Sequence, residues 1–581
     1  MRRLLEVFEE MIRKISVLLR RLARDPLVWI VCGLALAYFG LVSLRPIGIF
    51  WSPDEGGKYI HVLSMIKSGN PAMPLEYPGS YLDREAQFVP LFFWSQAGGQ
   101  IYSWWPVGFP LMTVPLYLLL GWNGLYVIPA LSGALCALLA GLLTRQIVPQ
   151  DRRLPVASAL VTGLGTPIGF YSTTFWEHTA ATACFLSAVL FAHRAWKTQR
   201  ARWLVLSGML ASLATFLRID LAAMSVGLGL ALIFLNWRWS VRWGMSYVLM
   251  GSAWLYLNWH LMGHALGRNW LDAPGTLATA PLLGGIRDAG LWFFPYVLFN
   301  APFVIALDLG RVVLVLATMC VALALVSPLL RRFKWASLIA YTGLAAISAS
   351  VLFHPEGYRS VHGLVLIAPH VVFAIWLYTS PSDTRGQAFP LMLLGVCATT
   401  AILYIVRAWF AAGGLQWGPR YLLTLYPLLV VASVVGLARA WPPLRQFMRN
   451  SLVALYLVCV LIGVGYEVRG MYAALSAMRY YDQTRQAILQ LDPKPVVTKC
   501  IWLGAVIPDL YWTGSVFALH KSQPLDDWIA EARRVGIHDF YTVEMDLCEP
   551  VTLDSVVARR SVDPGGITVV PLQIEPSQPS R

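Results

Sequence analysis

Long apolar segments recur along the chain from about residue 28 to residue 470, and they limit the possible folds more than any other feature. A helix needs roughly 20 apolar residues to cross a hydrocarbon core about 30 Å thick. The strands of a soluble α/β enzyme would instead give apolar runs of about 4–8 residues. Of 581 residues, 57% are hydrophobic and 13% are charged. We therefore expect an all-α polytopic membrane protein.

Basic residues orient the predicted spans, because loops on the cytoplasmic side carry an excess of Lys and Arg. Each predicted inner turn holds a basic residue, so the net charge of +14 reflects topology and predicts no nucleic-acid partner. The stretch 106–122 is broken by three prolines, and we expect it to be interfacial. About thirteen spans with a cytoplasmic N-terminus result. They are 28–49, 125–146, 154–172, 177–195, 203–217, 221–237, 243–262, 311–330, 335–353, 363–379, 388–410, 421–438 and 451–470.

This path predicts three parts. Residues 1–25 combine an apolar stripe with basic residues, which indicates an amphipathic helix on the cytoplasmic leaflet rather than a signal peptide. Residues 26–470 form the transmembrane domain, with a long polar outer loop at 50–105. Residues 471–581 lack long apolar runs, and we expect them to form a small extracytoplasmic α/β domain.

Short patterns in this tail predict its elements. Val496–Thr498 is β-like, and Leu525–Val535 has the pattern of an amphipathic helix. The Pro-rich end, 564–581, is expected to fray.

The most informative polar motif is Trp51-Ser52-Pro53-Asp54-Glu55, directly after the first predicted span. Two adjacent carboxylates at a membrane boundary are costly to remove from water, which indicates a function. The alternative is a solvated loop start, in which Ser52 or Asp54 caps a helix and Glu55 sits favourably in its first turn. Lys58 and Tyr59 follow, and a short amphipathic helix is predicted over 60–69.

A second motif in the same loop is Tyr102-Ser103-Trp104-Trp105-Pro106-Val107-Gly108-Phe109-Pro110. With these motifs and its layout over most of 28–470, the chain resembles the GT-C superfamily of membrane glycosyltransferases. It is most similar to the branch of protein O-mannosyltransferases and lipid A aminoarabinose transferases, which has an Asp-Glu pair in the first outer loop. The resemblance implies the GT-C fold and transfer of a sugar from a polyprenyl-phosphate donor to a glycan, lipid or protein acceptor on the outer face of the inner membrane.

The resemblance also implies roles for acidic residues. Asp54 would be the base that takes the acceptor's proton, and Glu55 would support it or bind the acceptor. A later outer loop in the family often holds a second acidic residue, which favours Glu177 as an acceptor or sugar contact. The alternative for Glu177 is a solvated turn, and its neighbour His178 is a weaker candidate. Some relatives have a basic residue and a Tyr three and four positions after the Asp, whereas Lys58 and Tyr59 come one position later, which weakens donor and acceptor roles for them.

Arginines at predicted outer turns are the candidates for binding the leaving phosphate, because a guanidinium donates several hydrogen bonds and stays charged. For each of them the alternative is a basic anchor at the headgroup level, and Asp220 could simply neutralise Arg218. We expect Arg218, Arg359 and Arg420 to line one cavity with Asp54 and Glu177. The full set of candidates for donor-phosphate binding is Lys58, Arg218, Arg359, Arg420 and His354.

No metal or cofactor is predicted. His178, His354 and His362 lack the i, i+4 spacing of a zinc helix, and no nucleotide-binding Gly-rich loop is visible.

Two other functions stay open. An oligosaccharide ligase with a polyprenyl-diphosphate donor would depend on a large later outer loop, whereas here the first outer loop is the largest. A transporter or flippase would show paired half-repeats, which we do not see.

Of the eight cysteines, only Cys500 and Cys548 lie in the polar tail. In an oxidising compartment such a pair is a disulfide candidate. Each follows a β-like stretch, so the two could lie on neighbouring strands. The alternative is two free thiols in a small core.

Overall fold

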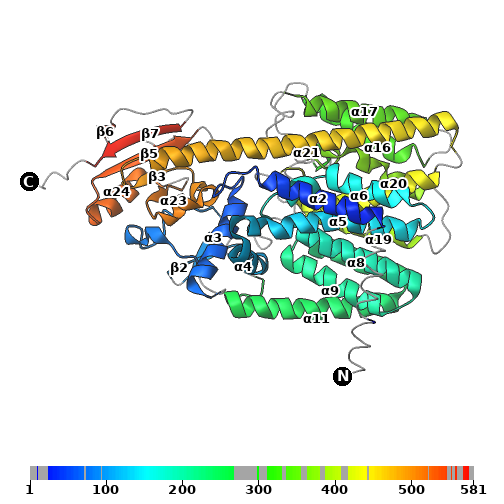
Figure 1. The fold of residues 1–581 in the computed structure, drawn as a ribbon, viewed down its shortest axis with the longest axis horizontal. Helices are drawn as coiled ribbons and strands as arrows, with labels where there is room; N and C mark the ends of the chain where they lie inside the picture. The colour runs from blue at the N-terminus through cyan, green and yellow to red at the C-terminus, as the bar shows by residue number, and fades with distance from the viewer. Residues whose placement is uncertain are drawn as a thin grey trace, which may run out of the picture. The chain divides into compact units, whose positions relative to one another are not determined.

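The computed structural model describes part of the chain, which Figure 1 shows as a ribbon. The described residues are 10, 24–70, 74–92, 94–97, 99–266, 297–299, 310–329, 335–354, 363–379, 387–406, 417–440, 444–520, 523–545, 548, 551, 557–558 and 567–574. The predicted helix over 1–25 therefore lies almost entirely outside them.

The chain divides into two compact units. The first comprises Met1–Ser43, Tyr126–Ala253 and Pro281–Met471, and the second comprises Leu44–Leu125, Trp254–Ala280 and Tyr472–Arg581. The second unit therefore combines the predicted outer loop with the C-terminal tail. The three-part division made from the sequence stays a prediction.

The first unit is built from apolar helices. They are α2 (Pro26–Val42), α5 (Val127–Ile147), α6 (Arg153–Leu164), α7 (Ile168–Ser172), α8 (His178–Thr198), α9 (Arg202–Leu217), α10 (Leu221–Leu235), α16 (Gly310–Val326), α17 (Ala336–Leu352), α18 (Leu364–Ile367), α19 (Ala388–Val406) and α20 (Leu425–Ala440), with the 3-10 helices η4 (Pro369–Tyr378) and η7 (Arg420–Leu422). Two long helices, α11 (Trp237–Met262) and α21 (Gln446–Leu489), contribute residues to both units.

Local chemistry explains how these helices begin and pack. The carboxylate of Asp25 accepts a hydrogen bond from the N–H of Leu27 (3.1 Å) at the start of α2 and pairs with Arg145 (2.6 Å) in the last turn of α5. Helices α10 and α19 approach closely where Gly227 faces Gly395, since a Cβ at either position would overlap the other backbone. In a bilayer the hydrophobic effect does not drive helices together, and small residues favour packing because they let the two backbones approach closely.

Several predicted spans differ from the structure, and four of them show why. The first, 28–49, ends at Val42, before Arg45-Pro46. The span 154–172 is broken between α6 and α7, where Pro167 cannot continue a helix. The span 363–379 consists of α18 and the 3-10 helix η4, because Ala368 before Pro369 is not helical. The span 451–470 continues to Leu489 in α21, because the residues after Gly470 are mostly good helix formers.

In the second unit, the outer loop forms more structure than the sequence predicted. Its elements are α3 (Pro53–Ser68), η1 (Pro78–Tyr81), the hairpin of β1 (Trp94–Ala97) and β2 (Gln100–Ser103), α4 (Gly108–Leu120) and η2 (Gly121–Tyr126). The helix expected over 60–69 begins seven residues earlier, at Pro53, and it ends at Gly69 (φ 66°). The acidic pair is therefore inside a helix.

The tail forms a five-stranded sheet with the order β4-β3-β5-β7-β6. Strand β3 is parallel to β4 and β5, whereas β7 is antiparallel to β5 and β6. The elements after α21 are β3 (Val496–Thr498), α22 (Leu503–Val506), α23 (Pro508–Trp512), β4 (Val516–Ala518), α24 (Leu525–Arg534), β5 (Asp539–Met545), β6 (Val557–Ala558) and β7 (Ile567–Gln573). The predicted strand at 496–498 and the predicted amphipathic helix are both present.

The predicted disulfide between Cys500 and Cys548 is confirmed, with Cα atoms 5.5 Å apart. It joins the segments that follow two neighbouring parallel strands, since Val496 of β3 pairs with Tyr541 of β5. The prediction that 564–581 frays is wrong for β7, whose Leu572 is buried.

Loop and tail share one apolar core. Leu82 and Phe88 of the loop are buried together with Trp528 and Phe540 of the tail. The N–H of Ala518 also donates to the carbonyl of Phe88 (2.8 Å), so the loop chain extends the edge of β4. The tail therefore shares its core, and one backbone hydrogen bond at the edge of β4, with residues more than 400 positions earlier in the chain.

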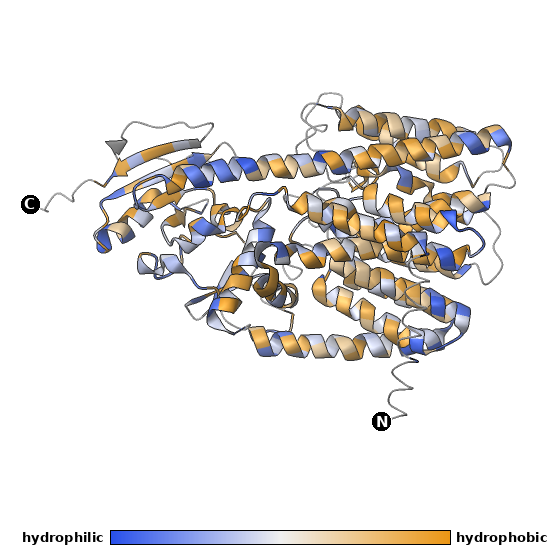
Figure 2. Ribbon diagram, viewed as in Figure 1, coloured by the Kyte–Doolittle hydropathy of each residue, from blue (hydrophilic) through white to orange (hydrophobic). Residues whose placement is uncertain are grey.

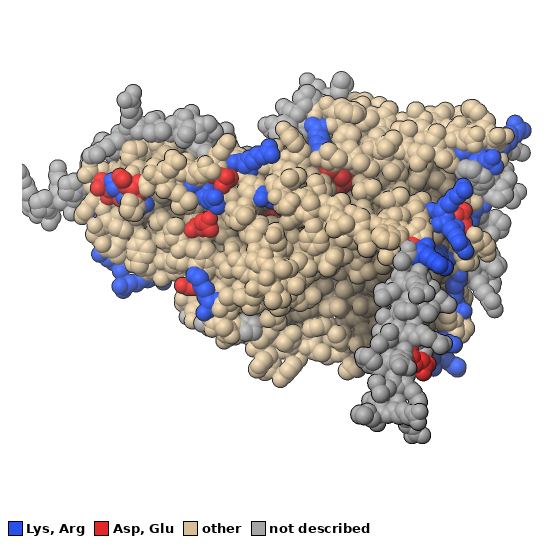
Figure 3. Space-filling model, in the orientation of Figure 1, with Lys and Arg blue, Asp and Glu red and all other residues tan. Residues whose placement is uncertain are grey.

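The helices of the first unit carry apolar surfaces along their length and polar residues at their ends, as Figure 2 shows. Over these helices the face seen in Figure 3 is almost free of charged side chains, which gather where the helices end. Large apolar side chains such as Phe234, Leu249 and Leu461 are exposed. Among the described residues, two helices are long and apolar enough to cross a membrane, Gly108–Ile147 and Gln446–Leu489, and shorter apolar helices accompany them. The predicted number of spans stays a prediction.

Candidate active site

Helix α3 carries the acidic pair in its first turn. Pro53 suits the first helical position, where a backbone N–H would have no helical partner. Glu55 follows Ser52 by three residues and completes a capping box. Its Oε2 accepts hydrogen bonds from the N–H groups of Trp51 (3.0 Å) and Ser52 (3.3 Å). Glu55 therefore fixes the start of the helix that carries Asp54.

Neither carboxylate is in a solvated loop. Asp54 is 5% exposed and Glu55 is fully buried. The other oxygen of Glu55 faces the guanidinium of Arg45, which comes from the segment before α3. A buried carboxylate needs such a cation, because burial without a partner is costly. The solvated loop start considered from the sequence is wrong, whereas the helix N-cap at Ser52 and the place of Glu55 in the first turn are correct.

Lys58 shares a face of α3 with Asp54. The two residues are four positions apart, so their side chains lie on neighbouring turns of one face. Lys58 is 2% exposed, and its Nζ lies 4.4 Å from the ring centroid of Trp105. Tyr59 lies about 140° around the helix from Asp54, at about 100° per residue, and its hydroxyl is 3.0 Å from that of Tyr117. The structure therefore brings Lys58, but not Tyr59, to the face of Asp54.

In the first unit, Arg218 is at the centre of a charged cluster. It leaves the end of α9 in an extended conformation (φ −148°, ψ 109°) and is 8% exposed. Its Nη2 is 2.9 Å from Oδ1 of Asp220, and its Nη1 is 3.8 Å from Oε1 of Glu177. Burial disfavours the charged form, but the carboxylates of Asp220 and Glu177 outweigh it and raise the pKa of Arg218. The guanidinium therefore stays charged although it is buried.

His178 joins this cluster from the first turn of α8. The guanidinium of Arg218 donates to Nε2 of His178, because an arginine has no acceptor atom. Nδ1 of His178 is 3.6 Å from Oε1 of Glu177. The ring also stacks on Tyr171 of α7, with centroids 5.1 Å apart and an interplanar angle of 4°. The ring of His178 is therefore held between Arg218 and Tyr171.

Arg420 reaches the same cluster through Tyr421. The guanidinium carbons of Arg218 and Arg420 lie 5.2 and 5.0 Å from the centroid of the Tyr421 ring. Arg420 also donates to the Tyr421 hydroxyl (3.2 Å) and lies 5.2 Å from the Trp176 ring. Gly418 has a φ of 65°, which suits glycine and lets the chain turn into η7. Two of the predicted arginines therefore lie together with Glu177.

Two other candidates have a different outcome. The contact shown for His354 is with Arg469 of α21, whose Nη2 donates to the His354 carbonyl (2.5 Å). Arg359 lies outside the described residues, as does His362. Among the described residues, no group of three or more His, Cys, Asp or Glu side chains could hold a metal ion.

Sequence reasoning assigned no role to three residues beside these sites. Arg45 and Trp105 contact the α3 motif, and Glu467 of α21 accepts a hydrogen bond from the N–H of Phe170 (2.8 Å), next to Tyr171. Two signals were available. Arg45 is a basic residue near the outer end of the first predicted span, and Glu467 is an ionisable residue inside the last one.

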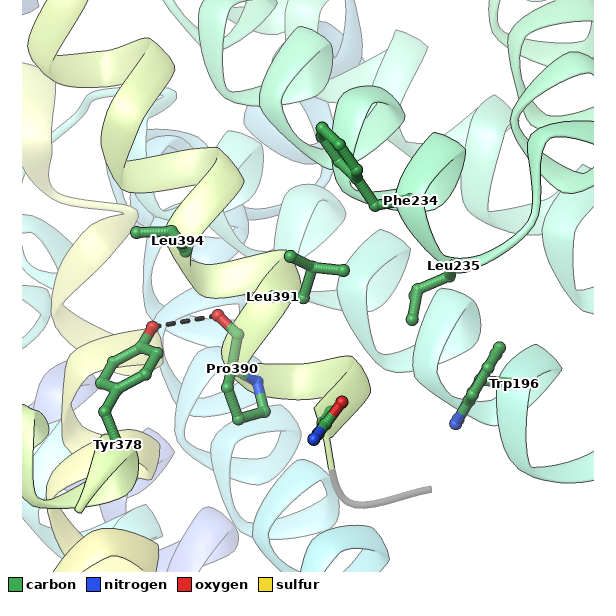
Figure 4. Close-up of a pocket in the computed structure, with 8 residues that line it drawn as sticks. Trp196, Phe234, Leu235, Tyr378, Pro390, Leu391 and Leu394 are labelled. Carbon is green, nitrogen blue, oxygen red and sulfur yellow. Dashed lines mark hydrogen bonds between the residues drawn. The ribbon is translucent and has the colours of Figure 1, made fainter. Parts of the chain in front are cut away.

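A cavity of about 390 Å³ lies at the opposite ends of α8 and α10 from the charged cluster (Figure 4). Tyr378 at its edge donates to the carbonyl of Pro390 (2.9 Å). The lining residues are almost all apolar and include none of the predicted site residues: Trp196, Phe234, Leu235, Tyr378, Gln387, Pro390, Leu391 and Leu394. This cavity is therefore not the charged site.

The fold is similar to that of a solved structure, ArnT, as the resemblance led us to expect. The structure is similar to that of ArnT from Cupriavidus metallidurans in the apo state, with a TM-score of 0.50 and 13% identity, over 94% of this chain and 98% of that chain. ArnT bound to undecaprenyl phosphate gives a TM-score of 0.48 and 12% identity over the same shares. An apo oligosaccharyltransferase from Archaeoglobus fulgidus gives 0.47 and 14%, over 90% of this chain and 70% of that chain. No protein-family model matches the chain, and no curated protein matches its sequence.

The exposed apolar helix surfaces indicate a membrane location. Exposed side chains such as Phe234 (79%) and Leu249 (76%) would be a liability in water, whereas lipid accommodates them.

Proposed function

We propose that the chain is an inverting glycosyltransferase that transfers a sugar from a polyprenyl-phosphate donor to a glycan, lipid or protein acceptor on the outer face of the cytoplasmic membrane. The observation that carries this proposal is the pair of arginines around Tyr421, within a GT-C fold. ArnT, which has this fold, binds undecaprenyl phosphate in one of its structures. A polyprenyl phosphate is thus a carrier lipid of the right class for the sugar donor.

The leaving group in this reaction is a lipid-linked phosphate. As the bond to the sugar breaks, negative charge develops on the phosphate oxygens, and fixed cations lower the energy of that state. Arg218 and Arg420 are suited to this role, because each offers a planar set of N–H donors. The carboxylates that hold Arg218 keep it charged and orient it.

The acceptor must lose a proton as it attacks the sugar. Asp54 is the proposed base, since a carboxylate on the side of the incoming acceptor serves a single displacement with inversion. Glu55 acts as a positioning residue through the capping box, and Lys58 on the same face of α3 compensates the charge of Asp54 or contacts the donor phosphate.

Glu177 and His178 are proposed to contact the sugar or the acceptor. Glu177 offers a carboxylate acceptor for hydroxyl groups. The ring of His178 is held beside it by stacking on Tyr171 and Trp176.

The proposed orientation has the N-terminus in the cytoplasm. Helices α8 and α10 each begin next to an acidic residue, Glu177 and Asp220, and end near basic residues such as Lys197 and Arg238. Basic ends prefer the cytoplasmic side. The disulfide of the tail also fits an oxidising compartment outside the cytoplasm.

A direct test uses the purified protein with sugars linked to polyprenyl monophosphate and, separately, to polyprenyl diphosphate. We expect release of the polyprenyl phosphate, and transfer when the acceptor is present, from the monophosphate only. The Asp54→Asn variant is the matched control. Turnover only with the diphosphate would support the oligosaccharide ligase instead. Mass spectrometry of co-purified lipid provides a second readout, in which we expect a polyprenyl monophosphate.

A further inference from the structure

Helix α3 rests directly on a short helix of the tail. A Cβ on Gly56 would overlap the carbonyl of Ala505 in α22, so only glycine permits this contact. Gly56 is buried and follows Asp54 by two residues. One glycine of the pair that separates Glu55 from Lys58 is thus explained by the close contact of Gly56 with α22.

Two further contacts hold α22 against the loop. The N–H of Phe50 donates to the carbonyl of Val506 (2.9 Å), just before α3 begins. A Cβ on Gly504 would lie 2.7 Å from the carbonyl oxygen of Pro90. Helix α22 therefore contacts the chain on both sides of the acidic motif.

The disulfide lies at the start of α22. The carbonyl of Cys500 accepts a hydrogen bond from the N–H of Leu503 (2.9 Å), the first residue of the helix. Cys548 follows the end of β5 by three residues, and its N–H donates to the carbonyl of Met545 (2.9 Å). The disulfide thus ties the beginning of α22 to the sheet.

We propose that α22 is the structural support of α3, the helix that carries Asp54. Gly56 and the Cys500–Cys548 disulfide act as positioning elements for Asp54, so full activity requires the disulfide of the tail to be intact. The inference rests on the proposed function only for the role of Asp54. Reduction by dithiothreitol breaks the S–S bond: the dithiol supplies two electrons and two protons, the cysteines become thiols, and the reagent becomes a cyclic disulfide.

Activity is the first readout, measured on the full-length protein in detergent. Reduction should lower kcat by about 10- to 100-fold, because a small displacement of a catalytic group has that effect. The KM for the donor should change less than kcat, because Arg218 and Arg420 belong to the other unit and only Lys58 is carried by α3. The variant C500A/C548A should have the same low kcat and should not respond to dithiothreitol.

Hydrogen exchange is the second readout, and it does not depend on the reaction. Complete reduction, verified by thiol labelling, should lower the protection of the peptide 53–68. Gly56→Ala should do the same in the oxidised protein. Gly33→Ala is the matched control, because Gly33 is a helical glycine of α2 with open space around its Cα.

The outcomes separate the two claims. Unchanged protection of α3 after complete reduction and in Gly56→Ala would overturn the proposal that α22 supports α3, whatever the activity. Full activity of the reduced protein would overturn the need for oxidation. A lack of turnover in the oxidised wild type would count against the proposed function, while the exchange result would still decide the role of α22.

Discussion

Nη1 of Arg45 lies 3.5 Å from Oε1 of Glu55, and the two side chains are 4% and 0% exposed. The pair joins the segment before α3 to the capping box at its start. Because each charge is removed from water, each depends on the other for compensation.

Loss of one partner should therefore destabilise the protein strongly. We expect Arg45→Met or Glu55→Leu to lower the free energy of unfolding by about 3–5 kcal/mol, the usual effect of an uncompensated buried charge. Denaturant or thermal unfolding in detergent measures this. The double variant should lose less than the sum of the single losses, and simple additivity would show that the pair is not coupled.

Asp54→Asn should abolish transfer while the fold stays intact. Removal of a general base lowers the rate by about 10²–10⁴-fold. The interaction of the charge with the helix N-terminus contributes about 0.3–1 kcal/mol of the stability that should be lost, and asparagine keeps the size of the side chain. Turnover of the purified variant and its unfolding midpoint are the two measurements. Near-normal turnover would remove Asp54 from the catalytic role.

Arg420→Ala should weaken donor binding. A hydrogen bond to a charged group contributes about 1.5–3 kcal/mol, so the KM for the donor should rise roughly 10- to 100-fold. Arg420→Lys should recover only part of this, because an ammonium cannot replace the planar set of donors beside Tyr421 and Trp176. Arg200→Ala, at a predicted inner turn, is the control. An equal effect in both alanine variants would indicate a general loss of positive charge.

His61 predicts a pH dependence of stability. It is buried in α3, and burial lowers the pKa of His61 from 6.5 to about 4. Above pH 6.5 the folded and unfolded states both hold it neutral. Below that pH the unfolded state takes up a proton first, so stability falls as the pH drops from 6.5 toward 4, by about 3 kcal/mol in total. The variant His61→Gln should show a flatter profile over this range. A wild-type profile that is equally flat would contradict the prediction.

The sequence indicated the helices of the first unit correctly where long apolar runs alternate with basic turns. It also indicated the disulfide, because Cys500 and Cys548 are the two cysteines of the polar tail. These features depend on local composition, which a sequence displays directly. The grouping of Arg218, Arg420 and Glu177 followed from their places at predicted outer turns.

The missed features depend on contacts between distant segments. The start of α3 at Pro53 was considered only as an alternative, because Gly56-Gly57 disfavours a helix by propensity, whereas the backbone of Ala505 requires a glycine at position 56. Strand β7 was missed because it contains Pro571, and proline is rare inside strands. Pro571 faces Tyr541, whose own N–H is directed to Pro495 of the preceding segment, so this pair needs no donor from proline.

The core shared by Leu82, Phe88 and the tail has a consequence for biosynthesis. Strand β7 ends at Gln573, so the ribosome adds nearly 500 residues after Phe88 before this core can close. At about 5–20 residues per second, the outer loop waits roughly 25 to 100 seconds in an incomplete state. A nascent chain released before that point would have its apolar helices but no finished loop, so quality control could recognise it by the loop alone.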